Sequence, residues 1–151
     1  MYSKEESAQI RKDFWIAFDV YSRKYLGAYR KWLTYNTGIK DLVLKFDVNR
    51  ENAKVLLSVE NRSEDKRFDI FVKLKEYELL YEDILGSGWI WDEQFILDND
   101  KEVCAIYKQL DNVNIYRKET WTLIFDFFAV EMLKLEEMFE EVKPFIKGIK
   151  N

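Results

Sequence analysis

Apolar residues recur at helical intervals in the first part of the chain. Ser3 and Glu6 have the spacing of a capping box, in which each side chain satisfies a backbone donor of the other residue. The apolar positions that follow are three or four residues apart, at Ile10, Phe14, Ala17, Phe18, Tyr21 and Tyr25. The pattern predicts a helix that begins after Ser3 and stops at Gly27, followed by an ordered loop over residues 29–40.

Two later stretches show the same period. Ser63 is a suitable N-cap, and Gly86-Ser87-Gly88 ends the apolar set Phe68, Phe71, Leu74, Tyr77, Tyr81 and Ile84. The last stretch ends at Pro144, and its apolar residues are Trp121, Phe125, Phe128, Met132, Leu135, Phe139 and Val142. A stripe of this kind is compatible with a coiled-coil seam, but large aromatics are not typical of such seams. We therefore expect this helix to pack on a sheet.

Between residues 42 and 59 the period changes to two, which predicts a β-hairpin. The apolar faces hold Leu42, Leu44, Phe46 and Val48 in the first run and Ala53, Val55, Leu57 and Val59 in the second. If these faces coincide, the residue numbers of every facing pair sum to 101, so Leu42 faces Val59. A second hairpin is predicted over residues 89–110, and its register stays open because Glu93 and Gln94 interrupt the alternation.

The predicted order is helix, hairpin, helix, hairpin, helix. Two hairpins with helices between them give an antiparallel sheet of about four strands covered by three helices, which is the α+β class. The length of 151 residues matches a single domain over 1–151, and an apolar fraction of 48% is sufficient for a hydrophobic core.

Composition restricts the chemistry and the compartment. The chain has no histidine and one cysteine, which excludes a Ser-His-Asp triad, a His-ligated metal and an internal disulfide. Cys104 lies in an apolar run, so we expect a buried residue without reactivity. The charged N-terminus lacks the apolar segment of a secretory signal, and no apolar run approaches the roughly 20 residues that span a bilayer. We expect a cytoplasmic protein with no cofactor and no membrane contact.

One hypothesis is a nuclease-like metal site. Asp47 followed by Glu60-Asn61-Arg62 superficially resembles the acidic residue and Glu-x-Lys motif of restriction-type endonucleases. The predicted register, however, places Asp47 opposite Lys54 and separates it from Glu60 by roughly 20 Å along the strand. Ligands of one metal must lie within about 2.6 Å of it. A metal-dependent hydrolase that uses carboxylates is therefore only a third hypothesis, and no catalytic or metal-ligating residue is predicted.

A second hypothesis is nucleic-acid binding through residues 21–40. The basic residues there are Arg23, Lys24, Arg30, Lys31 and Lys40, and they are interleaved with Tyr21, Tyr25, Tyr29, Trp32 and Tyr35. Single-strand binders combine cationic grooves with aromatic stacking surfaces. However, Tyr21 and Tyr25 continue the apolar stripe of the first helix, and the net charge of −4 weakens attraction to phosphates. Nucleic-acid binding through Arg23, Lys24, Arg30 and Lys31 is the alternative and not the favoured hypothesis.

A group of aromatic, glycine and acidic residues recurs along the chain in a distinctive order. It comprises Phe14-Trp15, the segment Trp32-Leu33-Thr34-Tyr35-Asn36-Thr37-Gly38-Ile39-Lys40, Glu60, Leu85-Gly86, Trp89-Ile90-Trp91-Asp92, Ile106-Tyr107-Lys108 and Trp121. In this order the chain resembles the bacterial domain-of-unknown-function family DUF4268 in its short stand-alone form, from about Phe14 to Phe145. No activity is established for that family. Its longer members look like fusions to nuclease-like domains, which implies an accessory part in nucleic-acid or defence systems.

The departures from the family pattern fall on polar positions. Asn61-Arg62-Ser63 stands where the family tends to show His-Lys-Asp, and Ala105 stands where it tends to show an arginine. Thr120-Trp121-Thr122 replaces an Asp-Trp-Pro. If the family has a catalytic site at these positions, the resemblance implies that this chain has lost it.

We therefore expect a binding module, and an enzyme is not favoured. The expected partner is another protein or a second copy of the chain, and the alternative is an accessory nucleic-acid-associated domain. The expected binding residues lie on the loop before the first hairpin and on adjacent strand ends: Trp32, Tyr35, Asn36, Thr37, Gly38, Lys40, Glu60, Arg62 and Trp91.

Overall fold

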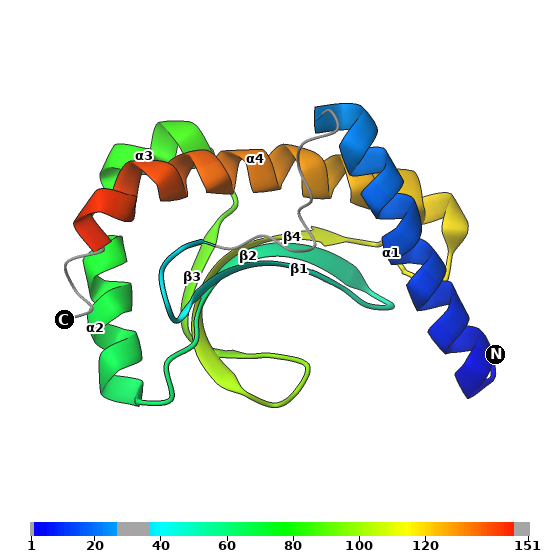
Figure 1. Cartoon of the computed structure of the whole chain (residues 1–151), viewed down its shortest axis with the longest axis horizontal. Coiled ribbons are helices and arrows are strands. Elements are labelled where there is room, and N and C mark those ends of the chain that lie inside the picture. The colour runs from blue at the N-terminus through cyan, green and yellow to red at the C-terminus, as the bar shows by residue number, and fades with distance from the viewer. Residues whose placement is uncertain (1, 27–36, 147–151) are drawn as a thin grey trace.

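The computed structural model describes residues 2–26 and 37–146, and these form one sheet covered by helices (Figure 1). In chain order the elements are α1 (Lys4–Leu26), β1 (Leu42–Val48), β2 (Asn52–Val59), α2 (Glu64–Lys75), α3 (Glu78–Leu85), β3 (Ile90–Ile96), β4 (Glu102–Asp111), the short 3₁₀ helix η2 (Lys118–Thr120) and α4 (Trp121–Ile146). This confirms the α+β class and the predicted order of helices and hairpins.

The helix starts follow the predicted caps. Glu6 N donates to Ser3 Oγ at 3.1 Å while Ser3 N donates to Glu6 Oε1 at 3.0 Å, so the capping box is formed. Lys66 N donates to Ser63 Oγ at 3.3 Å at the start of α2. Gly27 and residues 29–36 of the predicted loop lie outside the described residues. The helix α4 continues past Pro144 to Ile146, because a proline near the end of a helix disturbs only the last turn.

The single helix predicted between Ser63 and Gly86 is in fact two helices. Glu76 N donates to Val72 O, but Tyr77 N donates to Leu74 O at 3.1 Å, and this tighter turn ends α2. The chain then changes direction, so that Tyr77 stacks on Phe145 of α4 with ring centroids 5.2 Å apart. The apolar stripe is continuous in the sequence because both helices bury it, although against different neighbours.

The sheet is antiparallel with the strand order β1-β2-β4-β3. The predicted register of the first hairpin is confirmed: Leu42 pairs with Val59 and Val48 pairs with Ala53. In the second hairpin Asp92 pairs with Ala105 and Phe95 pairs with Val103, so the register shifts between them. This irregularity lies at Glu93 and Gln94, where the sequence alternation is interrupted.

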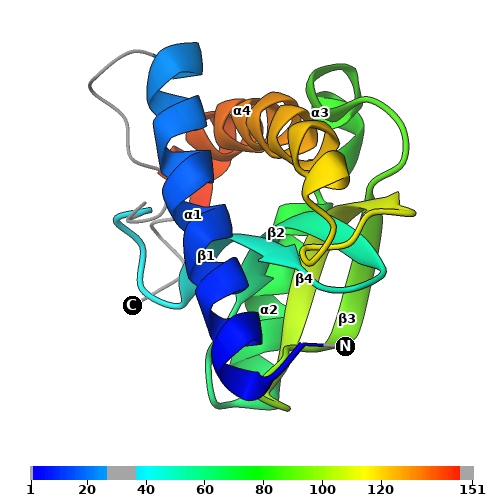
Figure 2. The same cartoon turned by 90° about the vertical axis from the view of Figure 1, so that its right-hand side faces the viewer.

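The core lies between one face of the sheet and α4, which lies across it, and α1 closes the core where it crosses α4 at one end of the sheet (Figures 1 and 2). Phe14 and Phe18 of α1 and Phe128 of α4 are fully buried, and Phe128 lies 4.6 Å from Phe46 of β1 between ring centroids. The stripe of α4 therefore packs on the sheet and α1, as expected. Cys104 is also fully buried, and burial raises the pKa of its thiol to about 11.

The opposite face of the sheet is covered more than the sequence predicts. Leu56 and Ser58 alternate with the apolar residues of the first hairpin and so point to the opposite face, yet both are buried. The irregularity in β3 curls the second hairpin beneath the sheet (Figure 1), so that Phe95 and the turn at residues 97–99 face Leu56 across a small cavity. Simple alternation fails here because a strand bent by a bulge can cover its own sheet.

Among the described helices, none has the length and apolarity to span a bilayer.

Candidate functional site

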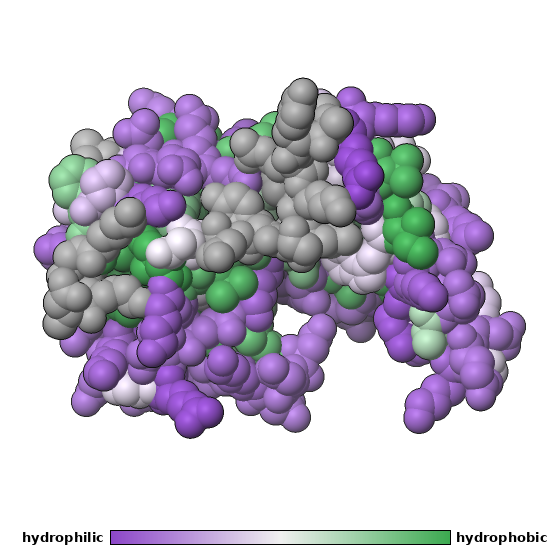
Figure 3. Space-filling model, in the orientation of Figure 1, coloured by the Kyte–Doolittle hydropathy of each residue, from purple (hydrophilic) through white to green (hydrophobic). Residues whose placement is uncertain are grey.

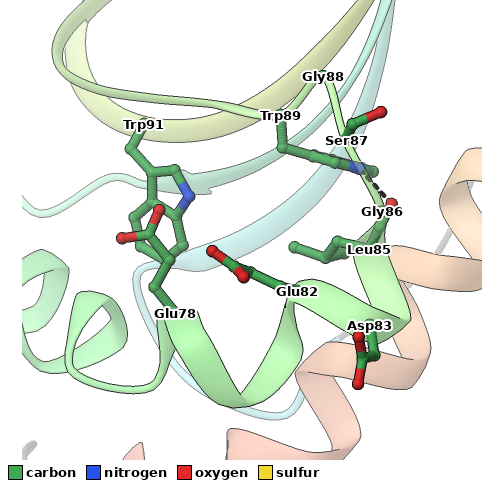
Figure 4. Close-up of a pocket in the computed structure, with 9 residues that line it drawn as sticks. All are labelled: Glu78, Glu82, Asp83, Leu85, Gly86, Ser87, Gly88, Trp89 and Trp91. Atoms are coloured by element: carbon green, nitrogen blue, oxygen red, sulfur yellow. Dashed lines mark hydrogen bonds between the residues drawn. The ribbon is translucent and has the colours of Figure 1, made fainter.

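A pocket of about 480 Å³ lies between α3 and the start of β3 (Figure 4). Its lining comprises Glu78, Glu82, Asp83 and Leu85 of α3, the loop Gly86-Ser87-Gly88, and the two indoles of Trp89 and Trp91. Ligand sites in proteins typically have volumes of about 300–1,000 Å³ and combine apolar walls with a few polar groups. We therefore regard this acid–tryptophan pocket as the candidate site.

The two tryptophans are fixed by contacts with the neighbouring helices α2 and α3. Trp89 Nε1 donates to Leu85 O at 2.8 Å, which ties the indole to the end of α3. Trp91 packs against Phe71 of α2 with ring centroids 5.6 Å apart, and Lys75 Nζ lies 5.4 Å from the centre of the same ring. Because these contacts come from α2 and α3, the aromatic wall is held in place before any ligand arrives.

The rim of the pocket requires glycine. Gly86 has φ 74° and ψ −164°, a backbone conformation that is essentially restricted to glycine. Gly88 has φ 92°, and a Cβ at this position would lie 3.2 Å from Lys108 Cε. The loop therefore passes directly over Lys108, whose Nζ lies 3.3 Å from Glu131 Oε1. Lys108 is thus engaged with α4 instead of the pocket carboxylates.

The electrostatic character of the pocket is acidic. Three carboxylates and no basic side chain line it. Among the residues that the structure describes, none forms an ion pair with Glu78, Glu82 or Asp83. The surrounding stretch, residues 51–100, carries 13 acidic and 6 basic residues, a balance of −7. Glu82 and Asp83 are exposed and Glu78 is half-buried, so a cation entering this pocket meets three acidic side chains beside two aromatic rings.

Family membership can now be assigned. The family model described as "Domain of unknown function (DUF4268)" matches residues 10–143. The chain belongs to the DUF4268 family. This confirms the resemblance seen in the sequence. No curated protein and no solved structure matches the chain.

The predicted binding residues of this DUF4268 domain do not form one cluster. Trp32, Tyr35 and Asn36 lie outside the described residues. Trp91 lines the pocket, and its strand position faces the same side of the sheet as Ile106. Glu60 belongs to the opposite side, two residues beyond Ser58, which pairs with Ala105. The structure therefore separates Trp91 from Glu60.

The described part of the predicted loop has a clear structural role. Thr37 is buried, its Oγ1 accepts a hydrogen bond from Ile39 N at 3.1 Å, and it donates to Leu42 O at 2.8 Å. Gly38 has φ 77°, and a Cβ there would lie 3.3 Å from Lys143 Nζ. The Thr-Gly pair shapes the turn that leads into β1, whereas Lys40 is exposed.

Glu60 is neutralised by two lysines. Lys45 Nζ lies 2.7 Å from Glu60 Oε2, and Lys101 Nζ lies 3.3 Å from Oε1. Burial by itself raises the pKa of Glu60, but the hydrogen bonds and positive charge, chiefly those of Lys45, outweigh burial and lower it. Asp47 pairs with Lys54 at 3.7 Å. Within residues 2–26 and 37–146, no three potential acidic or cysteine ligands come together at a metal site.

The segment after β2 is held in place by a residue that the sequence did not single out. Arg67 is buried, and its guanidinium donates to Asn61 O at 3.0 Å and to Glu102 Oε2 at 3.0 Å. Asn61 Nδ2 also donates to Asp41 Oδ2 at 2.9 Å. Arg62 is exposed beside these contacts. The only sequence signal for this anchoring role of Arg67 is its position beside the apolar stripe of a predicted helix, and that signal is weak.

The predicted basic patch is described only in part, because Arg30 and Lys31 lie outside the described residues. Arg23 pairs with Asp19 at 3.1 Å, and Lys24 is exposed. Tyr21 donates a hydrogen bond to Asp126 of α4, and burial together with this bond raises its pKa to about 12. Figure 3 shows apolar surface near α1, where Ile16 and Val20 are about half exposed.

Proposed function

We propose that this DUF4268 domain is a non-enzymatic binding module whose acid–tryptophan pocket takes a positively charged organic group. The observation that carries the proposal is the joint lining of one pocket by three carboxylates and two indoles without a basic residue. Cations are attracted both to uncompensated carboxylates and to the faces of tryptophan rings. Neither feature attracts an anion.

The chain already contains one contact of the proposed kind. Lys75 places its ammonium 5.4 Å from the centre of Trp91, within the range of about 6 Å at which cation–π attraction acts. This contact supports the view that the electrostatic environment of Trp91 suits an ammonium group. A ligand in the pocket would meet the same indole together with Glu78 and Glu82 of α3 (Figure 4).

The polar residues outside the pocket support binding more than chemistry. Glu60 forms ion pairs with Lys45 and Lys101, and the Thr37 hydroxyl forms a hydrogen bond within the turn before β1. The acidic pocket would repel nucleic-acid phosphates, which supports placing any nucleic-acid contact elsewhere. The sequence favours another protein or a second copy of the chain as the partner that carries this charged group, and this stays a prediction.

The test follows the indole N–H signals in a ¹H–¹⁵N NMR spectrum during titration with n-butylammonium at low salt. We expect the Trp89 and Trp91 signals to shift and those of Trp15 and Trp121 to stay in place. The double variant Glu78→Gln/Glu82→Gln should lose the shifts. The matched control Glu137→Gln/Glu141→Gln removes two carboxylates at the same spacing from α4, outside the pocket, and should keep them. No shift in the native chain, or an undiminished shift in the first variant, would overturn the proposal.

A further inference from the structure

Two of the pocket carboxylates belong to one helical turn. Glu78 and Glu82 are four residues apart in α3, so they are separated by about 6 Å along the helix axis. Figure 4 shows both carboxylates on the side of α3 that faces the tryptophans, while Asp83 points away from Trp91. The pocket therefore presents a pair of negative charges with a defined spacing, and not a single one.

From this pair we infer that the ligand is a linear aliphatic diamine or polyamine, an inference that rests on the proposed function. A chain of four carbons between two amines has five bonds of about 1.5 Å, and its zigzag spans about 6 Å. One ammonium can thus lie at Glu78 while the other lies at Glu82. A ligand with one charge leaves one carboxylate uncompensated.

The repulsion between these two like charges on α3 gives a second reason for a dication. Negative side chains at positions i and i+4 destabilise a helix. The described part of the chain offers no ion pair to either Glu78 or Glu82, and the first turn of α3 contains no basic residue that could relieve the repulsion. A bound dication removes the repulsion, whereas a monocation removes only part of it.

The aromatic wall suits the hydrocarbon part of such a ligand. Methylene chains pack along apolar surfaces while their charged ends stay with polar groups, as lysine side chains do. Trp89 and Trp91 provide this surface beside the carboxylates. A primary ammonium also has three hydrogen-bond donors, which the carboxylates can accept. A quaternary ammonium has none, so a primary amine fits the pocket better.

The experiment is isothermal titration calorimetry of the intact chain with unbranched diamines of two to six carbons, n-butylamine, choline and a short lysine-containing peptide. We expect the affinity to be highest at four or five carbons and about tenfold, or about 1.4 kcal/mol, tighter than for n-butylamine. Glu78→Gln or Glu82→Gln should reduce the diamine to the affinity of n-butylamine. Glu137→Gln/Glu141→Gln should leave it unchanged, and circular dichroism should show that every variant is folded.

The possible failures are distinguishable. Equal affinities for the diamines, n-butylamine and choline would overturn the diamine inference and leave the cation pocket intact. A lysine peptide that binds more tightly than every diamine would assign the site to a protein partner and would also overturn it. The absence of binding by every cation would overturn the proposed function itself.

Discussion

The glycines at the pocket rim allow backbone strain to be separated from side-chain contact. Gly86 has φ 74° and ψ −164°, and no atom lies within 4 Å of the position that a Cβ would take. An alanine at this position therefore meets no neighbour, but it must adopt a conformation that costs about 1–3 kcal/mol. Gly86→Ala should lower the free energy of unfolding by that amount through backbone strain alone.

Gly88→Ala adds a contact to the strain. Its Cβ would lie 3.2 Å from Lys108 Cε, which is the flexible part of that side chain. We expect a loss similar to that of Gly86→Ala plus a small excess, and the excess should disappear when Lys108 is also changed to alanine. The neighbouring Ser87→Ala is the control, and it should change stability by less than about 0.5 kcal/mol because Ser87 is exposed.

Urea unfolding measured by circular dichroism gives these free energies, provided that the slope with urea is unchanged. If Gly86→Ala unfolds at the same urea concentration as Ser87→Ala, Gly86 does not hold the backbone conformation described. The description of the loop that forms the pocket rim would then be contradicted. Gly86→Ala and Gly88→Ala should also weaken amine binding, since the loop forms one wall of the pocket.

Three further variants test the core and two half-buried carboxylates. Phe128→Ala should cost about 3–5 kcal/mol in urea unfolding, because the ring is fully buried between α1 and the sheet. The lowered pKa of Glu60 contributes stability that is present above its unfolded pKa and is lost as pH falls through its folded pKa, so Glu60→Gln should destabilise at pH 7, and the loss should shrink as the pH is lowered. For Asp47 the pKa is raised, by burial first and then by the charge of Asp98, so stability is lost as pH rises through the folded pKa. Asp47→Asn should therefore stabilise the protein at pH 7. Urea unfolding at pH 7 that shows Glu60→Gln to be stabilising, or Asp47→Asn to be destabilising, would contradict these pKa directions.

The first hairpin was predictable because local pattern and long-range pairing agree. Leu42, Leu44 and the facing residues Leu57 and Val59 alternate on a buried face, and this shared face together with the short turn fixes the register. The capping box at Ser3 was predictable for a similar reason, since its hydrogen bonds lie within four residues. Local chemistry decides both features.

The pocket was only partly predictable. Trp91 was expected to bind because of the family resemblance, but nothing in the sequence singled out Glu78 or Glu82. The break between α2 and α3 and the conformations of Gly86 and Gly88 decide that α3 turns back beside Trp89. A pair of glycines predicts a turn but not the direction in which the chain leaves it. The sequence therefore could not predict that the acidic residues of α3 lie beside the two tryptophans.

The most direct test of the central claim is a crystal structure of the chain grown with 1,4-diaminobutane. We predict density for the diamine between α3 and β3, with its nitrogens within hydrogen-bond distance of Glu78 and Glu82 and its carbons against Trp89 and Trp91. A diamine bound elsewhere on the acidic surface, with the pocket between α3 and β3 empty, would contradict the account.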